Sequence, residues 1–403
     1  MGLASVTSSR PLELSLDATA VPLDPVGAGR YTIELADALS ARHDVTVTLW
    51  ARRGDGERWR FAGRRVRDVA PRRRPTRLVW EQVRLPSLLS QGSPVPDVHH
   101  GPHYTMPARA RLPQVVTIHD MTFFDHPEWH ERSKVPVFRR AIVTAARRAA
   151  ALVCPSRVTA ARFEERCRPS GRVFVVPHGV DHDRFTDREP SPGHDATMLA
   201  SFGVRVPYVA FLGTIEPRKA VPTLVAAFDR LAPSIPELSL VLAGAPGWGA
   251  DDVDRAVAAS PHRARIVRLG YVPDEIVPVL LRTASAVAYP AIEEGFGLPA
   301  IEALACGTPL VTTMGTAMAE AAGPAAWLVA PGSADELAGA LAAALEDSAD
   351  TAARRHQGVA RASAHTWEMS AQGHMTAYRW ALEHAGTTGV GDSDRPGHQG
   401  LDR

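Results

Sequence analysis

Short runs of apolar, β-branched residues alternate along this chain with longer segments whose apolar residues recur every three or four positions. The first pattern predicts buried strands and the second amphipathic helices. Because strands that alternate with helices form parallel sheets covered on both faces, the chain is expected to have an α/β fold. The expected strands cover residues 12–16, 45–49, 115–118, 152–154, 173–176, 208–212, 238–243, 266–269, 286–289 and 310–312. The clearest expected helices cover residues 31–41, 138–151, 221–231, 299–305 and 335–345.

The same pattern predicts more than one domain. The chain has 403 residues, which exceeds one ordinary hydrophobic core. Pattern and composition change together around residues 186–202, where Pro, Ser and Gly indicate an exposed linker. We therefore expect a first domain over residues 1–190 and a second over 203–363. A further helix at 364–385 carries large apolar residues that favour docking on the first domain, and the polar tail 386–403 is expected to be disordered.

Composition narrows the class of protein. Apolar residues make up 45% of the chain and charged residues 22%, which is typical of a globular protein. The net charge of +1 gives no reason to expect nucleic acid as a partner. Cys154, Cys167 and Cys306 lie far apart and are odd in number, so a reducing cytosol fits best. The sequence shows no signal-like or membrane-spanning apolar run, and we expect a cytoplasmic protein.

The segment from Tyr289 to Leu310 carries the strongest chemical signal. A strand ends near Tyr289, a loop with Gly295 and Gly297 follows, and Pro299 is suited to the first turn of a helix. Ligands of open parallel sheets bind at this edge, where the N–H groups of a helix N-terminus favour phosphate. The segment therefore predicts a binding site for a phosphorylated ligand.

Two carboxylates accompany this loop. Glu294 and Glu302 would repel a bare diphosphate, but they could accept hydrogen bonds from hydroxyls that flank it on a sugar and a ribose. Alternatively, Glu302 is only an acid favoured by the macrodipole at the start of a helix. The surrounding glycines and prolines favour binding. The candidate residues of this segment are Glu294, Gly295, Phe296, Gly297, Leu298 and Glu302.

Arg218 and Lys219 stand directly before the expected helix 221–231. A cation at a helix N-terminus is unfavourable by about 0.3–1 kcal/mol. An anion held between the two cations and the helix would remove this conflict, so we interpret them as diphosphate ligands. The alternative is a solvated surface pair with an ion pair to Glu216.

Two weaker signals lie in the first half. Gly27 and Gly29 follow the first strand and could let backbone amides approach a phosphate or a sugar, although the third glycine of a dinucleotide fingerprint is missing. His119 ends a central apolar strand, beside the expected crevice. A lone histidine is usually structural, but this location favours a role at the ligand.

Three D-x-D pairs could hold a divalent metal that carries a diphosphate: residues 181/183, 252/254 and 392/394. With Arg218 and Lys219 available to neutralise phosphate, we predict no metal and no cofactor. The segment Arg132–Arg148 mixes basic and apolar positions and could lie on an anionic membrane surface. An ordinary amphipathic helix with an arginine-rich outer face explains it equally well.

Several of these motifs, in fixed order, resemble the retaining family 4 glycosyltransferases of the GT-B fold. They include Gly29-Arg-Tyr, Val116-Thr-Ile-His-Asp, Val176-Pro-His-Gly-Val-Asp, Leu212-Gly-Thr-Ile-Glu-Pro-Arg-Lys and Glu294-Gly-Phe-Gly. Trp80-Glu-Gln-Val-Arg-Leu-Pro further resembles a bacterial branch of mannosyl- and rhamnosyltransferases. The resemblance implies two Rossmann-like parallel-sheet domains that face a central cleft, with the acceptor on the first and the nucleotide sugar on the second.

The resemblance also implies roles for individual residues. Glu294 would bind hydroxyls of the donor sugar, Glu302 the ribose, and Arg218 with Lys219 the diphosphate. His119 would contact the transferred sugar, and the amide of Gly29 would approach the phosphates. Ala220 departs from the family pattern, in which a polar residue usually follows the lysine. Such enzymes retain the anomeric configuration and generally need no metal.

The favoured hypothesis is transfer of a hexose, most simply mannose from GDP-mannose, to a lipid-linked or glycan acceptor at the cytoplasmic membrane face. Cell-surface polysaccharide or glycolipid synthesis would be the context. One alternative is a sugar-nucleotide epimerase or hydrolase of the same fold. Another is a non-catalytic module that binds nucleotide sugars.

Overall fold

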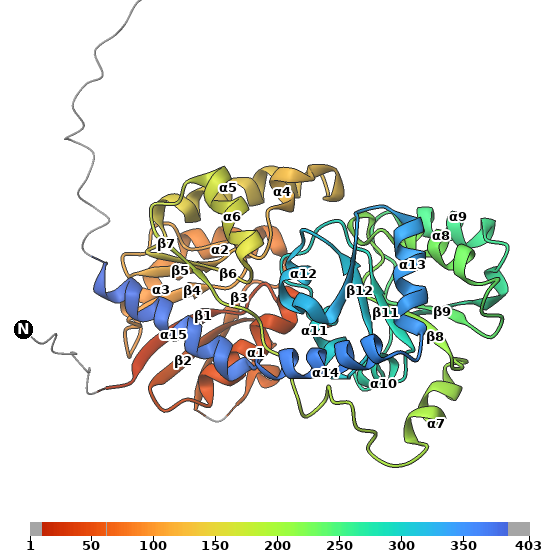
Figure 1. Cartoon of the computed structure of the whole chain (residues 1–403). Coiled ribbons are helices and arrows are strands. Elements are labelled where there is room, and N and C mark those ends of the chain that lie inside the picture. Colours follow the sequence, from red (N-terminus) through yellow and green to blue (C-terminus); the bar gives the residue numbers. More distant parts are fainter. Residues whose placement is uncertain (1–9, 62, 386–403) are drawn as a thin grey trace, which may run out of the picture.

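Two parallel sheets with helices on both faces make up the protein (Figure 1). The computed structural model describes residues 10–61 and 63–385. The first sheet has the strand order β3-β2-β1-β4-β5-β6-β7 and the second β10-β9-β8-β11-β12-β13. In both sheets every strand pair is parallel. The α/β architecture expected from the alternating pattern is confirmed.

The first sheet is built from residues 12–175. Its strands are β1 (Leu12–Asp17), β2 (Val45–Arg52), β3 (Arg64–Ala70), β4 (Val98–Gly101), β5 (Gln114–Thr117), β6 (Ala151–Cys154) and β7 (Arg172–Val175). The connecting helices are α1 (Ala28–Ser40), α2 (Arg74–Val83), α3 (Leu85–Gln91), α4 (Thr122–Asp125), α5 (Lys134–Arg148) and α6 (Arg157–Cys167).

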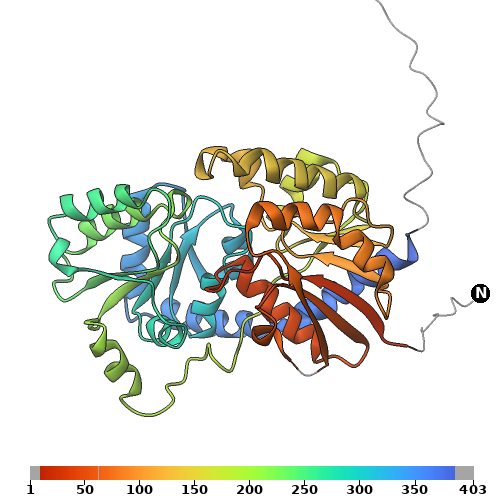
Figure 2. The same ribbon diagram turned by 180° about the vertical axis from the view of Figure 1, so that it is seen from behind.

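The second sheet is built from residues 208–329. Its strands are β8 (Tyr208–Leu212), β9 (Ser239–Ala243), β10 (Ile266–Gly270), β11 (Ala286–Tyr289), β12 (Leu310–Thr313) and β13 (Ala326–Val329). Its helices are α8 (Val221–Leu231), α9 (Ala250–Ala259), α10 (Ile276–Arg282), α11 (Leu298–Ala305), α12 (Ala317–Ala322), α13 (Ala334–Leu345) and α14 (Ala349–Ser363). Figure 2, seen from behind, shows the two sheets side by side.

Three strands escaped the sequence pattern, and each for a physical reason. β3 lies at an edge of its sheet and carries three arginines, so its alternation is mostly polar and exposed. β4 is fully buried, but it contains His99 and His100 in place of aliphatic residues. β13 is an edge strand of four residues.

The segment between the two sheets is more ordered than the linker expected there. It contains the helix α7 (His194–Ser201). Asp195 at the start of this helix is buried and accepts two hydrogen bonds from Arg282 of α10, at 2.6 and 2.8 Å. A buried bidentate pair of this kind fixes the segment to the second domain. The tail 386–403 lies outside the described residues.

The last helix, α15 (Trp367–Glu383), lies along the first sheet rather than the second (Figure 1). Its side chains Ala371, Met375 and Tyr378 are fully buried in the same core as Leu14 and Leu35. The chain therefore enters the second domain after β7 and returns to the first domain at its end. Nowhere in the described ranges is a helix long and apolar enough to cross a membrane.

A chain of buried hydrogen bonds ties α15 to the first sheet. The carbonyl of Ser370 can only accept, so Nδ1–H of His374 donates to it, and in the neutral ring Nε2 then accepts from the hydroxyl of Tyr31. This one constraint sets the direction of every following bond. The chain runs through Ser370, His374, Tyr31, Thr117, His100 and Tyr378, with distances of 2.7 to 2.9 Å.

This arrangement requires a neutral His374, and it predicts a loss of stability in acid. Burial lowers the pKa of His374 to about 4, whereas an unfolded chain has a histidine pKa of about 6.5. Between these values the unfolded state binds more protons, so the stabilisation is full above about pH 6.5 and is lost toward pH 4. We expect a loss of about 3 kcal/mol from this residue.

Urea unfolding across this pH range measures the effect. His374→Gln should give a shallower pH dependence than the parent, and His356→Gln, at an exposed site, should follow the parent. Parallel pH profiles for the parent and His374→Gln would contradict the assignment.

Candidate functional site

A cavity of about 420 Å³ lies between the two domains, at the carboxyl ends of both sheets. Strand order reverses at β1, which pairs with β2 and β4, and at β8, which pairs with β9 and β11. Open parallel sheets bind ligands where the order reverses. The cavity is lined by every predicted site residue except Gly29: Gly27, His119, Arg218, Lys219, Glu294, Gly295, Phe296, Gly297, Leu298 and Glu302.

Arg218 and Lys219 meet at one carboxylate. Both contact Oε1 of Glu294, Arg218 at 2.7 Å. The ammonium of Lys219 also donates to the hydroxyl of Tyr289 at 2.9 Å. Burial, and then the charge of Arg218, lower the pKa of Lys219 well below its ordinary value. The two cations are thus held close together in a poorly solvated place, where a further anion would be stabilised.

The alternative of a solvated surface pair is wrong for Lys219, which is only 5% exposed. The ion pair with Glu216 that this alternative includes does form, because Nε of Arg218 donates to Glu216 at 2.8 Å. Arg218 and Lys219 belong to one 3-10 turn directly before α8. Ala220 follows this turn in the left-handed conformation, with a φ of 50°. The turn lets both cations lie beside the cavity.

The loop before α11 is shaped by close approach. A Cβ on Gly295 would lie 1.8 Å from the carbonyl oxygen of His119, so this glycine lets the loop touch the first domain. Gly297 has a φ of 85°, and a Cβ there would lie 2.2 Å from Cγ of Met318. Packing between loop, α12 and the first domain therefore requires both glycines.

Glu302 also lines the cavity and is buried. Burial raises its pKa, and the guanidinium of Arg30 lies 3.4 Å from its carboxylate. Arg30 comes from α1 of the first domain and also pairs with Asp274 of the second at 2.6 Å. The sequence pattern did not single out Arg30, although it stands within the Gly29-Arg-Tyr motif.

His119 is held as a neutral imidazole. Its Nε2–H donates to the carbonyl of Pro102 at 2.8 Å, which leaves Nδ1 as an acceptor. Burial lowers the pKa of His119, so the ring is uncharged at neutral pH. It lies edge-on to the rings of Tyr31 and Tyr104, at 5.1 and 5.6 Å. A residue of this kind can accept a hydrogen bond from a hydroxyl in the cavity.

The first glycine loop differs from the expectation. Gly27 lines the cavity, with a φ of 49°. Gly29 does not, and its amide donates to the carbonyl of Val26 at 3.0 Å. A Cβ on Gly29 would lie 3.1 Å from Cβ of Pro25, so this glycine serves packing inside the turn. The amide predicted to approach a phosphate is already used.

The D-x-D pairs that the structure describes serve other contacts. Asp181 accepts hydrogen bonds from the amides of Asp183 and Arg184, while Asp252 and Asp254 pair with arginines. The third pair, residues 392 and 394, lies outside the described residues. Among residues 10–61 and 63–385, no group of three or more His, Cys, Asp or Glu side chains is placed to hold a metal ion.

Two family models match the chain, one on each domain. Residues 25–184 match the model described as Glycosyltransferase Family 4. Residues 202–361 match the model described as Glycosyl transferases group 1.

Curated proteins give partial matches. The O-antigen chain mannosyltransferase B of Escherichia coli is 29% identical over 287 residues, which cover 70% of this chain and 74% of that protein. The D-inositol 3-phosphate glycosyltransferase of Kribbella flavida is 34% identical over 227 residues, which cover 53% of this chain and 52% of that protein. The chain thus spans about half the length of the inositol phosphate enzyme.

Solved structures extend the likeness over nearly the whole chain. Sucrose-phosphate synthase from Thermosynechococcus elongatus has a TM-score of 0.74 at 20% identity, with 92% of this chain and 99% of that chain covered. Anabaena HepE, in complex with UDP and glucose, has a TM-score of 0.72 at 21% identity, with 91% and 98% covered. At such identities the likeness shows a shared fold.

The shared carboxylate of Glu294 yields a prediction for Glu294→Gln. Removing its charge leaves Arg218 and Lys219 to repel each other in a buried turn, which should cost about 3 kcal/mol of unfolding free energy. Inorganic diphosphate should restore much of this stability, because it can replace the missing anion.

Thermal unfolding with and without diphosphate tests this, with Glu165→Gln at an exposed position as the control. Equal stability of Glu294→Gln and the parent, with no response to diphosphate, would show that the charges are not coupled.

Proposed function

Because this chain belongs to the family 4 glycosyltransferases of the GT-B fold, we propose that it moves a hexose from a nucleotide diphosphate sugar to a lipid-linked or glycan acceptor. The observation that carries this proposal is the pairing of Arg218 and Lys219 beside Glu294 in the cavity between the domains. The cations suit a diphosphate, and the carboxylate suits the hydroxyls of the sugar joined to it.

The donor we favour is GDP-mannose. The proposal of mannose is supported by the similarity to a mannosyltransferase over most of the length of that protein. In this placement Glu302, which also lines the cavity, accepts hydrogen bonds from the ribose. Glucose from UDP-glucose is the main competing donor, since the Anabaena protein of the same fold is known in complex with it.

In the proposed reaction the anomeric configuration is retained. The bond between the anomeric carbon and the phosphate oxygen breaks, and the acceptor oxygen bonds to the same face of that carbon. The acceptor proton passes to the departing phosphate oxygen. Arg218 and Lys219 stabilise the negative charge that develops on the diphosphate, so we propose that no metal ion is needed. Nδ1 of neutral His119 accepts a hydrogen bond from a sugar hydroxyl.

The acceptor side of the cavity belongs to the first domain, whose outer helix α5 is basic. Phe138 and Ile142 of α5 are buried in the core, so its apolar face is not available to lipid. Arg140, Arg147 and Arg148 are exposed on the outer face. We propose that Arg132–Arg148 contacts an anionic membrane surface by charge, at the inner face of the plasma membrane.

A panel of nucleoside diphosphates and sugar nucleotides tests the donor. We expect GDP-mannose to raise the apparent melting temperature most, because a ligand stabilises the folded state in proportion to its binding. Transfer to a membrane or glycan extract should fall at least about 100-fold in Glu294→Ala and in Arg218→Ala/Lys219→Ala.

The exposed Glu165→Ala is the control for the assay. Undiminished transfer by the site variants would refute the site. Release of free sugar or of an epimer without acceptor would instead favour a hydrolase or epimerase.

Vesicle co-sedimentation tests the membrane surface. Binding should rise with the fraction of anionic lipid and fall with salt, and Arg140→Glu/Arg147→Glu/Arg148→Glu should remove it. Sedimentation that does not depend on lipid charge would contradict the proposal.

A further inference from the structure

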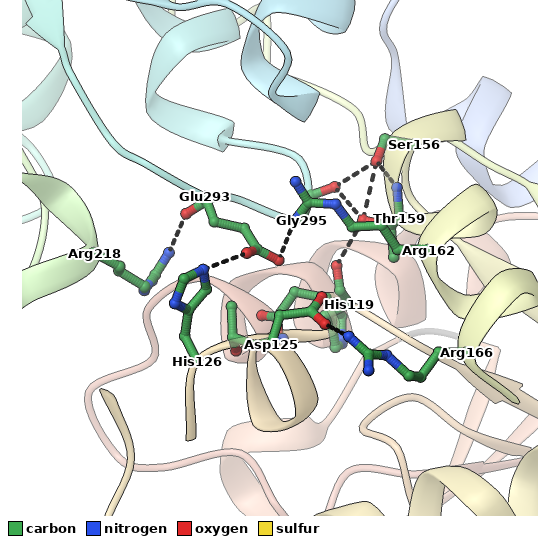
Figure 3. A network of polar contacts seen from close by, with 12 residues as sticks. His119, Asp125, His126, Ser156, Thr159, Arg162, Arg166, Arg218, Glu293 and Gly295 are labelled. Atoms are coloured by element: carbon green, nitrogen blue, oxygen red, sulfur yellow. Dashed lines mark hydrogen bonds and ion pairs between the residues drawn. The ribbon is translucent and has the colours of Figure 1, made fainter. Parts of the chain in front are cut away.

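Glu293, the residue before Glu294, is not among the residues that line the cavity. Its carboxylate points toward His126 and Arg162 of the first domain (Figure 3). One carboxylate oxygen lies 2.6 Å from Nη1 of Arg162 on α6, and the other lies 3.5 Å from Nε2 of His126. Glu293 is only 5% exposed. A carboxylate in such surroundings depends on its partners, since an isolated buried charge is strongly unfavourable.

The residue after Glu294 is held by the same helix. The carbonyl of Gly295 accepts hydrogen bonds from the hydroxyls of Ser156, at 2.9 Å, and Thr159, at 3.2 Å. Ser156 is the N-cap residue of α6, and its oxygen also accepts from the amide of Thr159. Both neighbours of Glu294 are therefore fixed to α6, on the opposite side of the domain boundary.

Glu294 itself contacts cations of the second domain. The loop is also tied there by its backbone, because the amide of Ile292 donates to the carbonyl of Arg218 at 2.8 Å. The peptide from residue 292 to 295 thus has contacts with both domains. If the domains separate, Glu293 and Gly295 lose their contacts with α6, while Glu294 keeps only its contacts within the second domain.

We propose that Glu293 is a positioning residue that couples closure of the two domains to the placement of Glu294. Its ion pair with Arg162, together with the bonds to Gly295, holds the loop in position for the donor sugar only when α6 is in contact. This inference rests on the proposed function and adds to it the residue that completes the donor site on closure. The consecutive residues Glu293 and Glu294 thus contact different domains and have different roles.

The test uses Glu293→Ala and Arg162→Met, singly and together. Arg162 is 36% exposed, so its side chain can be hydrated when Glu293 is absent, and Glu293→Ala is expected to fold. Each single variant should lower kcat/KM about tenfold to a hundredfold, because a small displacement of a positioning group has effects of this size. The double variant should lose no more than the single ones, and Arg162→Lys should recover part of the activity.

Glu320→Gln is the matched control. Glu320, in α12, accepts hydrogen bonds from the amides of Arg157 and Val158 at the start of α6, so it crosses the same boundary without touching the loop. Hydrogen exchange of residues 291–298 in the ligand-free protein should rise in Glu293→Ala and stay at the parent rate in Glu320→Gln. Arg166→Met, on the same helix, should also match the parent.

The inference is overturned if exchange of the loop is unchanged in Glu293→Ala, if Glu320→Gln lowers kcat/KM equally, or if the effects of the single variants add. The exchange measurement needs no substrate. A parent protein that binds no sugar nucleotide would therefore refute the proposed function, while the exchange rates would still decide the role of Glu293.

Discussion

The site depends on the requirement that charge buried between two domains be balanced. Arg218 and Lys219 are placed by one tight turn, and the shared carboxylate of Glu294 makes their proximity tolerable in the absence of an anionic ligand. In the same cavity Arg30 balances Glu302 in a similar way, but across the domain boundary. In both ion-paired groups a charged ligand can replace one of the partners. The cleft is therefore suited to a ligand with several charges and hydroxyls.

Local sequence patterns predicted the cations and the carboxylates of the cavity. A cation pair before a helix is unfavourable by itself, and the structure places both cations in the cavity. A strand, a glycine loop and a proline-led helix in succession likewise predicted the location of Glu294 and Glu302. The family to which the chain belongs follows from several such motifs in fixed order. The information within each motif is local, while the family assignment depends on motifs that are spread from Gly29 to Glu294.

Features that rest on distant partners could not be predicted in this way. Arg30 acquires its importance from Glu302 and Asp274, and Glu293 from Arg162, and each of these partners is more than a hundred residues away. Gly29 is the opposite case, in which the local pattern predicted a contact with the ligand. The glycine instead allows close packing against Pro25 within its own turn. β4 was missed because a histidine is stable in a core only when it has hydrogen-bond partners. The partners of His99 and His100 are distant in the sequence and could not be read from it.

The return of α15 to the first sheet has a consequence for how the protein is made. Residues 12–175 form all seven strands of that sheet, yet part of its core comes from Ala371, Met375 and Tyr378. During synthesis, an apolar face of the first domain therefore stays uncovered until the second domain, and then α15, have left the ribosome. The earlier-made half of the molecule is completed last, so a fragment that ends after β7 lacks the helix that covers its sheet.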